Sequence, residues 1–364
     1  MKWSSQQSDA LNTVAQWLKR KDSPVFRLFG YAGTGKTTLA RHIAEGCNGD
    51  VLFAAFTGKA ASVLKAKGCD EASTIHSLIY RTREDEDGTG PLFKLNRQSE
   101  AGKADLIIID ECSMVDEELG RDLLSFGTPV LVLGDPAQLP PIKEGGFFTN
   151  QEPDIMLSQV HRQAEDNPIV HLSMLVRQGK PLAKGTYGAS KIISRRELTT
   201  EDVVNSDQVL VGMNKTRRAY NTRLRELQGL FDLYPAVGEK LVCLRNDKGK
   251  GLLNGGSWFV ERLRTPKGDA LRMDVCSEDD FRQKGVQVSV LKSFFEGNED
   301  EIPYSQRRDS DEFTYGYALT VHKAQGSQWD HITLFDESFA FREHRTRWLY
   351  TGLTRAAESI TVVV

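Results

Sequence analysis

The sequence predicts an α/β fold with parallel sheets, divided between two domains. Its 364 residues are more than one domain usually holds, and a hydrophobic content of 39% is enough for two cores. Short apolar runs alternate with helical patterns over the first 150 residues, as in βαβ units whose strands are buried on both faces. The same alternation returns near the C-terminus, after a stretch of strand-like residues with glycine turns.

The first domain is expected over residues 1–150. Its predicted strands are residues 25–29, 51–55, 106–109 and 130–133, and its predicted helices are residues 36–45, 58–65 and 117–125. Each helix is short enough to cross between neighbouring parallel strands. Four consecutive acidic residues followed by Gly-Thr-Gly-Pro interrupt this alternation, which predicts a small inserted hairpin at about residues 82–103.

The second domain is expected over residues 151–364. It begins with a helix at residues 169–178, a strand at 208–212 and a basic helix at 216–228. It ends with strands at residues 315–321, 332–335 and 359–364 and a helix at 345–354. Between these parts, strand patterns separated by turns such as Asn-Gly-Gly predict a small antiparallel β insert at about residues 246–303.

Composition and charge exclude several classes of protein. The 47 basic and 50 acidic residues nearly balance, so a nucleic-acid partner would have to be bound by local patches. No apolar stretch approaches the roughly 20 residues that span a bilayer. The N-terminus lacks the apolar core of a signal peptide, so we expect a cytoplasmic protein without a membrane span. Five widely spaced cysteines favour reduced thiols over a zinc site or a disulfide framework.

Residues 30–37, GYAGTGKT, match the phosphate-binding pattern G-x-x-x-x-G-K-[ST]. The motif lies between a predicted strand and a predicted helix, where backbone N–H groups and the helix terminus can surround phosphate oxygens. Lys36 would reach the β and γ phosphates, and Thr37 would hold Mg²⁺. The alternative, a glycine-rich turn without a ligand, is disfavoured by this position.

Asp110 and Glu111 follow the predicted strand 106–109, at the edge where open α/β sheets bind ligands. We expect Asp110 to coordinate Mg²⁺ and Glu111 to orient or deprotonate the attacking water. An acidic pair at a strand end is also a common solvated cap, so its meaning depends on the phosphate loop. Together the two motifs predict a functional phosphate site, which could serve a kinase, a transporter, a protein-remodelling ATPase or a helicase.

Further motifs lie in a fixed order along nearly the whole chain. They are SxxQxxA at residues 4–10, FTGKAA at 56–61, STIH at 73–76, DECSM at 110–114, GDPAQLPP at 134–141, VHRQ at 160–163, ALTVHKAQGS at 318–327 and YTGLTRA at 350–356. This series resembles the glutamine motif and motifs Ia, Ib, II, III, IV, V and VI of superfamily 1 helicases of the 5′-to-3′ group, Dda and RecD type. The resemblance implies two RecA-like P-loop NTPase domains, a pin hairpin in the first and an SH3-like β insert in the second.

The resemblance also implies ATP and Mg²⁺ as cofactors and assigns the residues of their site. Gln7 would recognise adenine, Gln138 would sense the γ-phosphate, and Arg162 and Arg355 would stabilise charge from the second domain. The expected ATP contacts are Gln7, Gly30, Ala32, Gly33, Thr34, Gly35, Lys36, Thr37, Thr38, Arg162 and Arg355. The expected catalytic groups are Lys36, Glu111, Gln138, Arg162 and Arg355. The alternative for Arg162 or Arg355 alone is a surface salt bridge. The alternative for Gln138 is a buried side chain that caps a loop.

A single strand of DNA is expected to run over motifs Ia, Ib and V, whose hydroxyl, imidazole and amine groups can hold successive phosphates. The expected contacts are Thr57, Lys59, Thr74, His76, Thr320, His322 and Lys323. Phe93 in the hairpin is the candidate strand-separating wedge, although an aromatic side chain there belongs as often to the hairpin's own core. The basic helix 216–228 either adds to the track or forms a solvated face.

The predicted function is an ATP-dependent DNA helicase or translocase that moves 5′ to 3′ on single-stranded DNA and unwinds duplex DNA. Its polarity rests on the resemblance. The alternatives are a translocase that remodels protein–DNA complexes with little unwinding, an ATP-gated nucleic-acid-binding module, and RNA as the track. The expected partners are forked duplex DNA and proteins of replication, repair or recombination. We expect the motor to be a monomer in a bacterial or phage-infected cell. Residues 326–328 read GSQ where many relatives have GSE, which leaves a charge-dependent contact there open.

Overall fold

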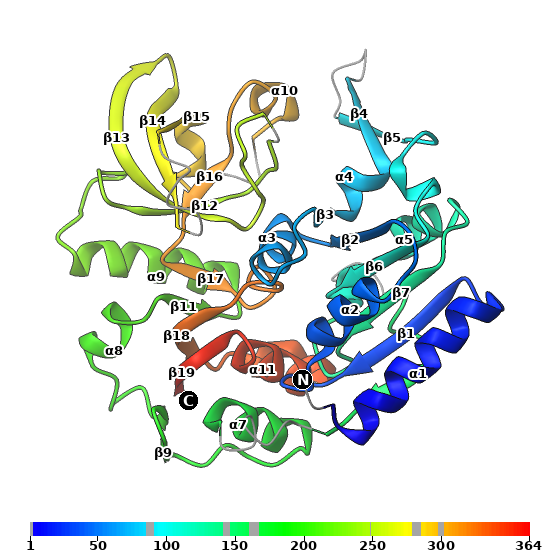
Figure 1. Cartoon of the computed structure of the whole chain (residues 1–364). Helices are drawn as coiled ribbons and strands as arrows, with labels where there is room; N and C mark the ends of the chain where they lie inside the picture. The colour runs from blue at the N-terminus through cyan, green and yellow to red at the C-terminus, as the bar shows by residue number, and fades with distance from the viewer. Residues whose placement is uncertain are drawn as a thin grey trace.

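The computed structural model describes residues 3–84, 91–140, 146–159, 167–247, 249–278, 285–297 and 302–364. These residues form two mainly parallel sheets, a five-stranded antiparallel sheet and a two-stranded hairpin. The hairpin and the antiparallel sheet project from the same side of the molecule (Figure 1). Among the described helices, none combines the length and the apolar character that a membrane crossing requires.

The first sheet has six parallel strands in the order β3-β2-β6-β7-β1-β8. They are β1 (Val25–Gly30), β2 (Val51–Ala55), β3 (Ser73–Thr74), β6 (Leu106–Asp110), β7 (Val130–Gly134) and β8 (Ile155–Leu157). Because β8 pairs with β1, this sheet continues to Leu157 instead of ending at residue 150. The strand β8 is not among the predicted strands, because only one of its three residues is fully buried.

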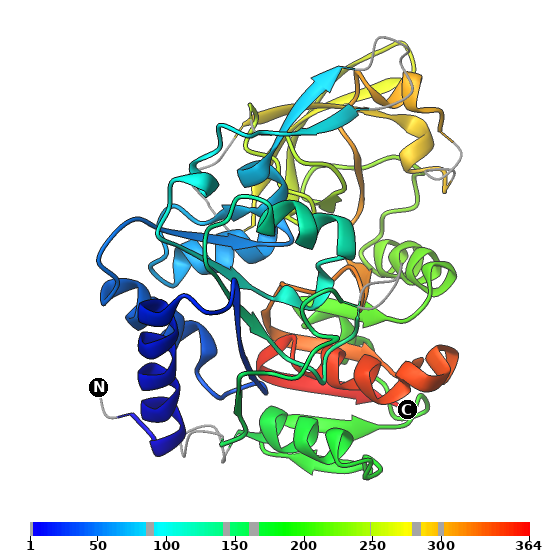
Figure 2. The same cartoon turned by 90° about the vertical axis from the view of Figure 1, so that its right-hand side faces the viewer.

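Helices cover both faces of the first sheet (Figure 2). They are α1 (Ser5–Arg20), α2 (Lys36–Glu45), α3 (Gly58–Ala66), α4 (Ile75–Ile79) and α5 (Glu117–Leu124). Alternate side chains of β6 divide between the two faces: Leu106 and Ile108 pack with α1 and α2, whereas Ile107 and Ile109 pack with α4 and α5. Burial on both faces explains the continuous apolar run that marks this strand in the sequence.

The second sheet has the order β17-β11-β18-β19-β10-β9 and is parallel except for β9. Its strands are β9 (Gly185–Tyr187), β10 (Ser190–Ile193), β11 (Gln208–Val211), β17 (Ala318–Thr320), β18 (Trp329–Phe335) and β19 (Ala356–Val363). The surrounding helices are α7 (Pro168–Arg177), α8 (Thr200–Val204), α9 (Asn214–Leu227) and α11 (Arg345–Leu353). Trp348 of α11 and Leu172 of α7 lie in one core with β18 and β19.

The two insertions are antiparallel, as their turn patterns predict. The hairpin pairs β4 (Tyr80–Glu84) with β5 (Pro91–Leu95), and its tip at 85–90 lies outside the described residues. The insert has the order β15-β14-β13-β12-β16, formed by β12 (Lys240–Cys243), β13 (Ser257–Lys267), β14 (Ala270–Ser277), β15 (Val286–Leu291) and β16 (Phe313–Tyr315). It is wider than the predicted 246–303, because its outer strands β12 and β16 merge in sequence with the apolar pattern of the second domain.

The basic helix α9 is partly structural. Arg225 forms a buried ion pair with Glu239, with Nε to Oε1 at 2.6 Å, and its guanidinium lies 4.1 Å from the centre of the Tyr315 ring. The Asn221 side chain donates to the Ala318 carbonyl and accepts from its N–H, each at 3.0 Å. These contacts join α9 to the insert and to β17.

Candidate nucleotide site between the two sheets

The phosphate loop joins β1 to α2 and is already shaped for an anion. Gly33 and Gly35 have φ of 78° and 82°, a left-handed backbone that favours glycine. Lys36 Nζ donates to the Gly30 carbonyl (2.6 Å) and the Tyr31 carbonyl (3.1 Å). An ammonium group has three donors, so one remains for a phosphate oxygen. The loop thus holds its own lysine at the helix N-terminus.

Thr37 and Asp110 form the oxygen pair that the sequence assigns to Mg²⁺. Thr37 Oγ1 donates to Asp110 Oδ2 at 3.0 Å, and the Glu111 N–H donates to Asp110 Oδ1 at 2.9 Å. Burial, followed by the charge of Glu111, raises the pKa of Asp110. A bound divalent cation would reverse this effect, and hydroxyl and carboxylate oxygens beside a phosphate site suit Mg²⁺. These residues therefore fit the metal.

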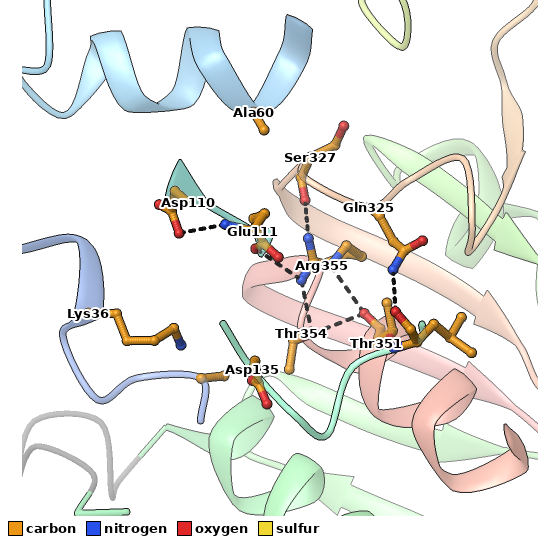
Figure 3. A network of polar contacts seen from close by, with 12 residues as sticks. Lys36, Ala60, Asp110, Glu111, Asp135, Gln325, Ser327, Thr351, Thr354 and Arg355 are labelled. Atoms are coloured by element: carbon orange, nitrogen blue, oxygen red, sulfur yellow. Dashed lines mark hydrogen bonds and ion pairs between the residues drawn. The ribbon is translucent and has the colours of Figure 1, made fainter. Parts of the chain in front are cut away.

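Arg355 reaches this site from the second domain, directly after α11. Its guanidinium donates to the carbonyls of Thr351 (3.1 Å) and Ser327 (3.2 Å), and Nη2 lies 4.0 Å from Glu111 Oε1 (Figure 3). The side chain is 6% exposed, so its charge is held in a water-poor environment. An arginine of one domain thus faces the candidate base of the other.

A cavity of about 320 Å³ lies between the two domains around these groups. The predicted residues that line it are Ala32, Gly33, Gly35, Lys36, Thr37, Thr38, Asp110, Glu111, Gln138 and Arg355. Gln138 is 6% exposed, and its Oε1 has no hydrogen-bond partner among the described residues. A buried carbonyl or amide without a partner is costly, so this side chain fits a site that a polar ligand completes.

Three predicted ATP residues, Gln7, Gly30 and Thr34, are not among the residues that line this cavity. Gln7 Nε2 donates to the Thr34 carbonyl (3.1 Å), and Gln7 Oε1 accepts from the Ser4 N–H (3.1 Å). Its amide therefore ties α1 to the phosphate loop. Arg162, with the rest of motif IV, lies outside the described residues.

Sequence reasoning does not identify three other groups at this interface. Arg177 of α7 lies over the Tyr31 ring, with its guanidinium carbon 3.4 Å from the ring centre. Asp135 lines the cavity, and the Tyr350 hydroxyl donates to its Oδ2 at 2.7 Å. Asp135 and Tyr350 belong to motifs III and VI, so the motifs mark them, but only the structure shows that they meet.

Three predicted DNA-contacting hydroxyls lie where helices or turns begin. Thr57 Oγ1 accepts from the Ala60 N–H (3.1 Å), Thr74 Oγ1 from the Ser77 N–H (3.1 Å) and Thr320 Oγ1 from the Lys323 N–H (3.2 Å). Motifs Ia and V touch, because a Cβ at Gly326 would lie 2.9 Å from Thr57 Oγ1. The structure thus brings these two parts of the predicted track together from opposite domains.

The basic groups of the predicted track are more buried than the sequence suggests. His76 packs against Phe56 with ring centres 5.9 Å apart, and His322 packs against Phe341 at 5.3 Å. Burial lowers the pKa of both histidines, which favours the neutral imidazole over the cation. Lys323 Nζ donates to Asn254 Oδ1 of the insert at 2.6 Å.

The other two predicted DNA contacts are placed less fully. Lys59 is buried near the same insert loop, since a Cβ at Gly255 would lie 4.0 Å from Lys59 Cβ. Phe93 is described only through its backbone, which pairs with Thr82 in the hairpin.

Comparison with known proteins identifies the family. Residues 2–197, more than half of the chain, match the family described as AAA domain. The chain belongs to the AAA domain family. Residues 315–363 of this AAA-family chain match a second family, the UvrD-like helicase C-terminal domain. The matched residues include motifs V and VI. Together the two matches confirm the resemblance to superfamily 1 helicases that the motifs indicate.

Curated relatives match the AAA-family chain over most of its length. The ATP-dependent RecD2 DNA helicase of Deinococcus radiodurans is 30% identical over 362 residues, which cover 91% of this chain and 46% of the relative. The RecBCD enzyme subunit RecD of Mycobacterium tuberculosis is 25% identical, over 92% of this chain and 66% of the relative. A probable conjugal transfer protein TraA of Sinorhizobium fredii is 24% identical, over 92% of this chain and 30% of the relative. The chain thus spans less than half the length of the RecD2 and TraA relatives.

Solved structures share the fold of the AAA-family chain. Bacteroides Pif1 bound to single-stranded DNA superimposes with a TM-score of 0.63 at 19% identity, covering 100% of this chain and 92% of that one. A structure of Pif1 helicases at forked duplex DNA gives a TM-score of 0.63 at 20% identity, over the same shares. These likenesses confirm the predicted fold of two RecA-like domains.

Proposed function

We propose that this chain is an ATP-dependent motor that moves 5′ to 3′ on single-stranded DNA and unwinds duplex DNA. The observation that carries the proposal is the 4.0 Å approach of Arg355 in the second domain to Glu111 in the first, across the cavity. Hydrolysis then depends on how closely the two domains lie, so nucleotide turnover can drive a change in their separation. The relative named as an ATP-dependent DNA helicase supports this activity.

The residues around the cavity divide the work of hydrolysis. The phosphate loop and Lys36 bind the phosphates, and Glu111 accepts a proton from the attacking water. Arg355 stabilises the charge that develops on the γ-phosphate. Mg²⁺, which Thr37 and Asp110 would hold, supplies further charge neutralisation when it is bound. The described residues that support this division, Lys36, Thr37, Asp110, Glu111 and Arg355, all line one cavity.

DNA movement follows from the contact between motifs Ia and V. Thr57 and Gly326 meet at the same interface that encloses the nucleotide cavity, and they belong to motifs Ia and V, which carry predicted DNA contacts. Opening the cavity would therefore separate the DNA contacts of motif Ia from those of motif V, and closing it would bring them together. The Pif1 structure bound to single-stranded DNA supports such a track. The 5′-to-3′ direction rests on the resemblance to the superfamily 1 motifs.

The partners follow from the same relatives. A RecBCD subunit and conjugal transfer proteins among them support partners in DNA recombination, repair or replication. The substrates are single-stranded and forked duplex DNA, and the motor acts as a monomer in the cytoplasm. RNA as a track remains an outcome of the test, because phosphate contacts do not read the 2′-OH.

Unwinding of tailed duplexes tests this function. With ATP and Mg²⁺, we expect strand separation of a duplex carrying a 5′ single-stranded tail and none of a duplex carrying a 3′ tail. Opening of the 3′-tailed duplex alone would contradict the direction. If ATP is hydrolysed but neither duplex is opened, the result would contradict unwinding and favour a translocase that remodels protein–DNA complexes.

A further prediction concerns the hairpin. Phe93→Ala is expected to retain DNA-stimulated ATP turnover but to lose most strand separation, because an apolar ring at the fork can occupy the space of a base pair. Lys94→Ala is the matched control, since neighbouring side chains of a strand point to opposite faces. Both rates are measured on the 5′-tailed duplex. Parallel loss of turnover and unwinding in Phe93→Ala would assign the ring to the core of the hairpin.

A further inference from the structure

Two hydroxyl groups of α11 hold the loop that follows β7, residues 135–139, here named the sensor loop because it carries Gln138. The Tyr350 hydroxyl donates to Asp135 Oδ2 (2.7 Å), and the Leu139 N–H donates to Thr351 Oγ1 (2.9 Å). The two contacts lie on either side of Gln138 in the sequence. The second domain therefore fixes both ends of a loop that belongs to the first domain.

Tyr350 also contacts the phosphate loop. The Ala32 N–H donates to the Tyr350 hydroxyl oxygen at 3.0 Å, so one phenol joins the phosphate loop to the sensor loop. Tyr350 is 1% exposed and Asp135 is 2% exposed, so water cannot replace either hydrogen bond. Burial raises the pKa of Tyr350, which keeps the phenol protonated and able to donate.

Gln138 depends on this backbone support. Its Oε1 has no hydrogen-bond partner among the described residues, so the loop around it must set where the amide points. Gln325 of the second domain adds a third contact, since its Nε2 donates to the Leu139 carbonyl at 3.0 Å. Three second-domain side chains thus stabilise the loop that presents one first-domain amide to the cavity.

The same helix also holds the Arg355 side chain in position. α11 ends at Leu353, and the Arg355 Nε donates to the Thr351 carbonyl at 3.1 Å. Thr351 therefore contacts the sensor loop through its hydroxyl and Arg355 through its carbonyl. A shift of α11 would displace Gln138 and Arg355 together.

We propose that Tyr350 and Thr351 are positioning residues that hold Gln138 toward the γ-phosphate only while the second domain is closed on the first. The inference rests on the proposed ATP hydrolysis and adds how its phosphate sensor is placed. In the open state the sensor loop loses its support on both sides of Gln138. Phosphate sensing and domain closure then become a single event.

Nucleotide binding to Tyr350→Phe and Thr351→Val tests the proposal, because each change removes one hydroxyl and nearly preserves shape. The probes are fluorescent ADP with Mg²⁺, and the same nucleotide with aluminium fluoride, which imitates the transferring phosphoryl group. We expect ADP affinity within about twofold of the wild type, while affinity for the aluminium fluoride complex and kcat fall by about 10- to 100-fold. The KM for ATP should change little.

Tyr315→Phe is the matched control. Its hydroxyl donates to the Leu233 carbonyl at 2.7 Å, and the residue is 8% exposed, so the change removes the hydrogen bond of a buried tyrosine that does not line the cavity. It should lower the thermal unfolding temperature as Tyr350→Phe does but leave kcat unchanged.

Two results would overturn the proposal. One is a Tyr350→Phe protein that keeps wild-type affinity for the aluminium fluoride complex. The other is parallel loss of ADP and aluminium fluoride binding, which would indicate general disruption of the site. Neither measurement needs DNA, so failure of DNA to stimulate the wild type would count against the motor and not against this inference.

Discussion

Glu111→Gln is expected to slow ATP hydrolysis by about 10²- to 10⁴-fold while nucleotide binding remains near the wild-type level. Glutamine keeps the size of the side chain but cannot accept the proton of the attacking water. Glu111 has a left-handed backbone with φ of 53°, and its N–H holds Asp110 Oδ1. This backbone bond does not involve the side chain, so the substitution leaves the support of Asp110 intact. Steady-state ATP turnover and binding of a fluorescent ATP analogue measure the two effects.

Two further variants delimit this prediction. Glu118→Gln changes an exposed carboxylate in the same domain and should leave turnover unchanged. Lys36→Ala should abolish turnover by a different route, because it removes the ammonium that reaches the phosphates. Near-normal hydrolysis by Glu111→Gln would show that another group activates the water.

Arg355→Lys is expected to reduce kcat by at least about tenfold, within the 10³- to 10⁵-fold contribution that a transition-state arginine can make. Lysine keeps the charge but cannot reproduce the fork that donates to two carbonyls and also approaches Glu111. ADP affinity should change much less than kcat, since the charge that the arginine stabilises develops during hydrolysis. Parallel measurement of kcat and ADP affinity checks this.

Arg347→Lys is the control for the arginine. Arg347 lies on the exposed face of α11, so its replacement should leave both quantities unchanged. Thermal unfolding of Arg355→Lys separates a local effect from loss of fold, because the guanidinium is buried. Wild-type kcat in a folded Arg355→Lys protein would remove Arg355 from the hydrolysis step.

The sequence was informative where one strand or helix is long and regular. The helix expected at residues 36–45 is α2 (Lys36–Glu45), and the strand expected at residues 51–55 is β2 (Val51–Ala55). The strands β8, β9 and β10 were not predicted, because their three or four residues include half-buried or exposed positions, whereas the equally short β11 is buried at all four positions. Of these strands, β8 joins the first sheet by pairing with β1, although it lies beyond residue 150.

Residue types alone could suggest the candidate site but not its connections. The phosphate loop and the acidic pair are local patterns whose chemistry follows from spacing. The contact between Thr351 and Leu139 joins residues 212 positions apart, and that between Tyr350 and Asp135 joins residues 215 apart. Such contacts depend on how the two domains pack, and the pattern of one segment does not predict that packing. The burial of His76, His322 and Lys323 likewise depends on packing from other elements.

The rate of ATP hydrolysis with and without single-stranded DNA tests the central claim, a nucleotide site between two domains that works as a DNA-driven motor. Single-stranded DNA binding across motifs Ia and V should favour the closed arrangement in which Arg355 faces Glu111. We therefore expect a large rise in kcat on adding single-stranded DNA, and loss of that rise in Arg355→Lys. A turnover rate that is the same with and without DNA would contradict the account.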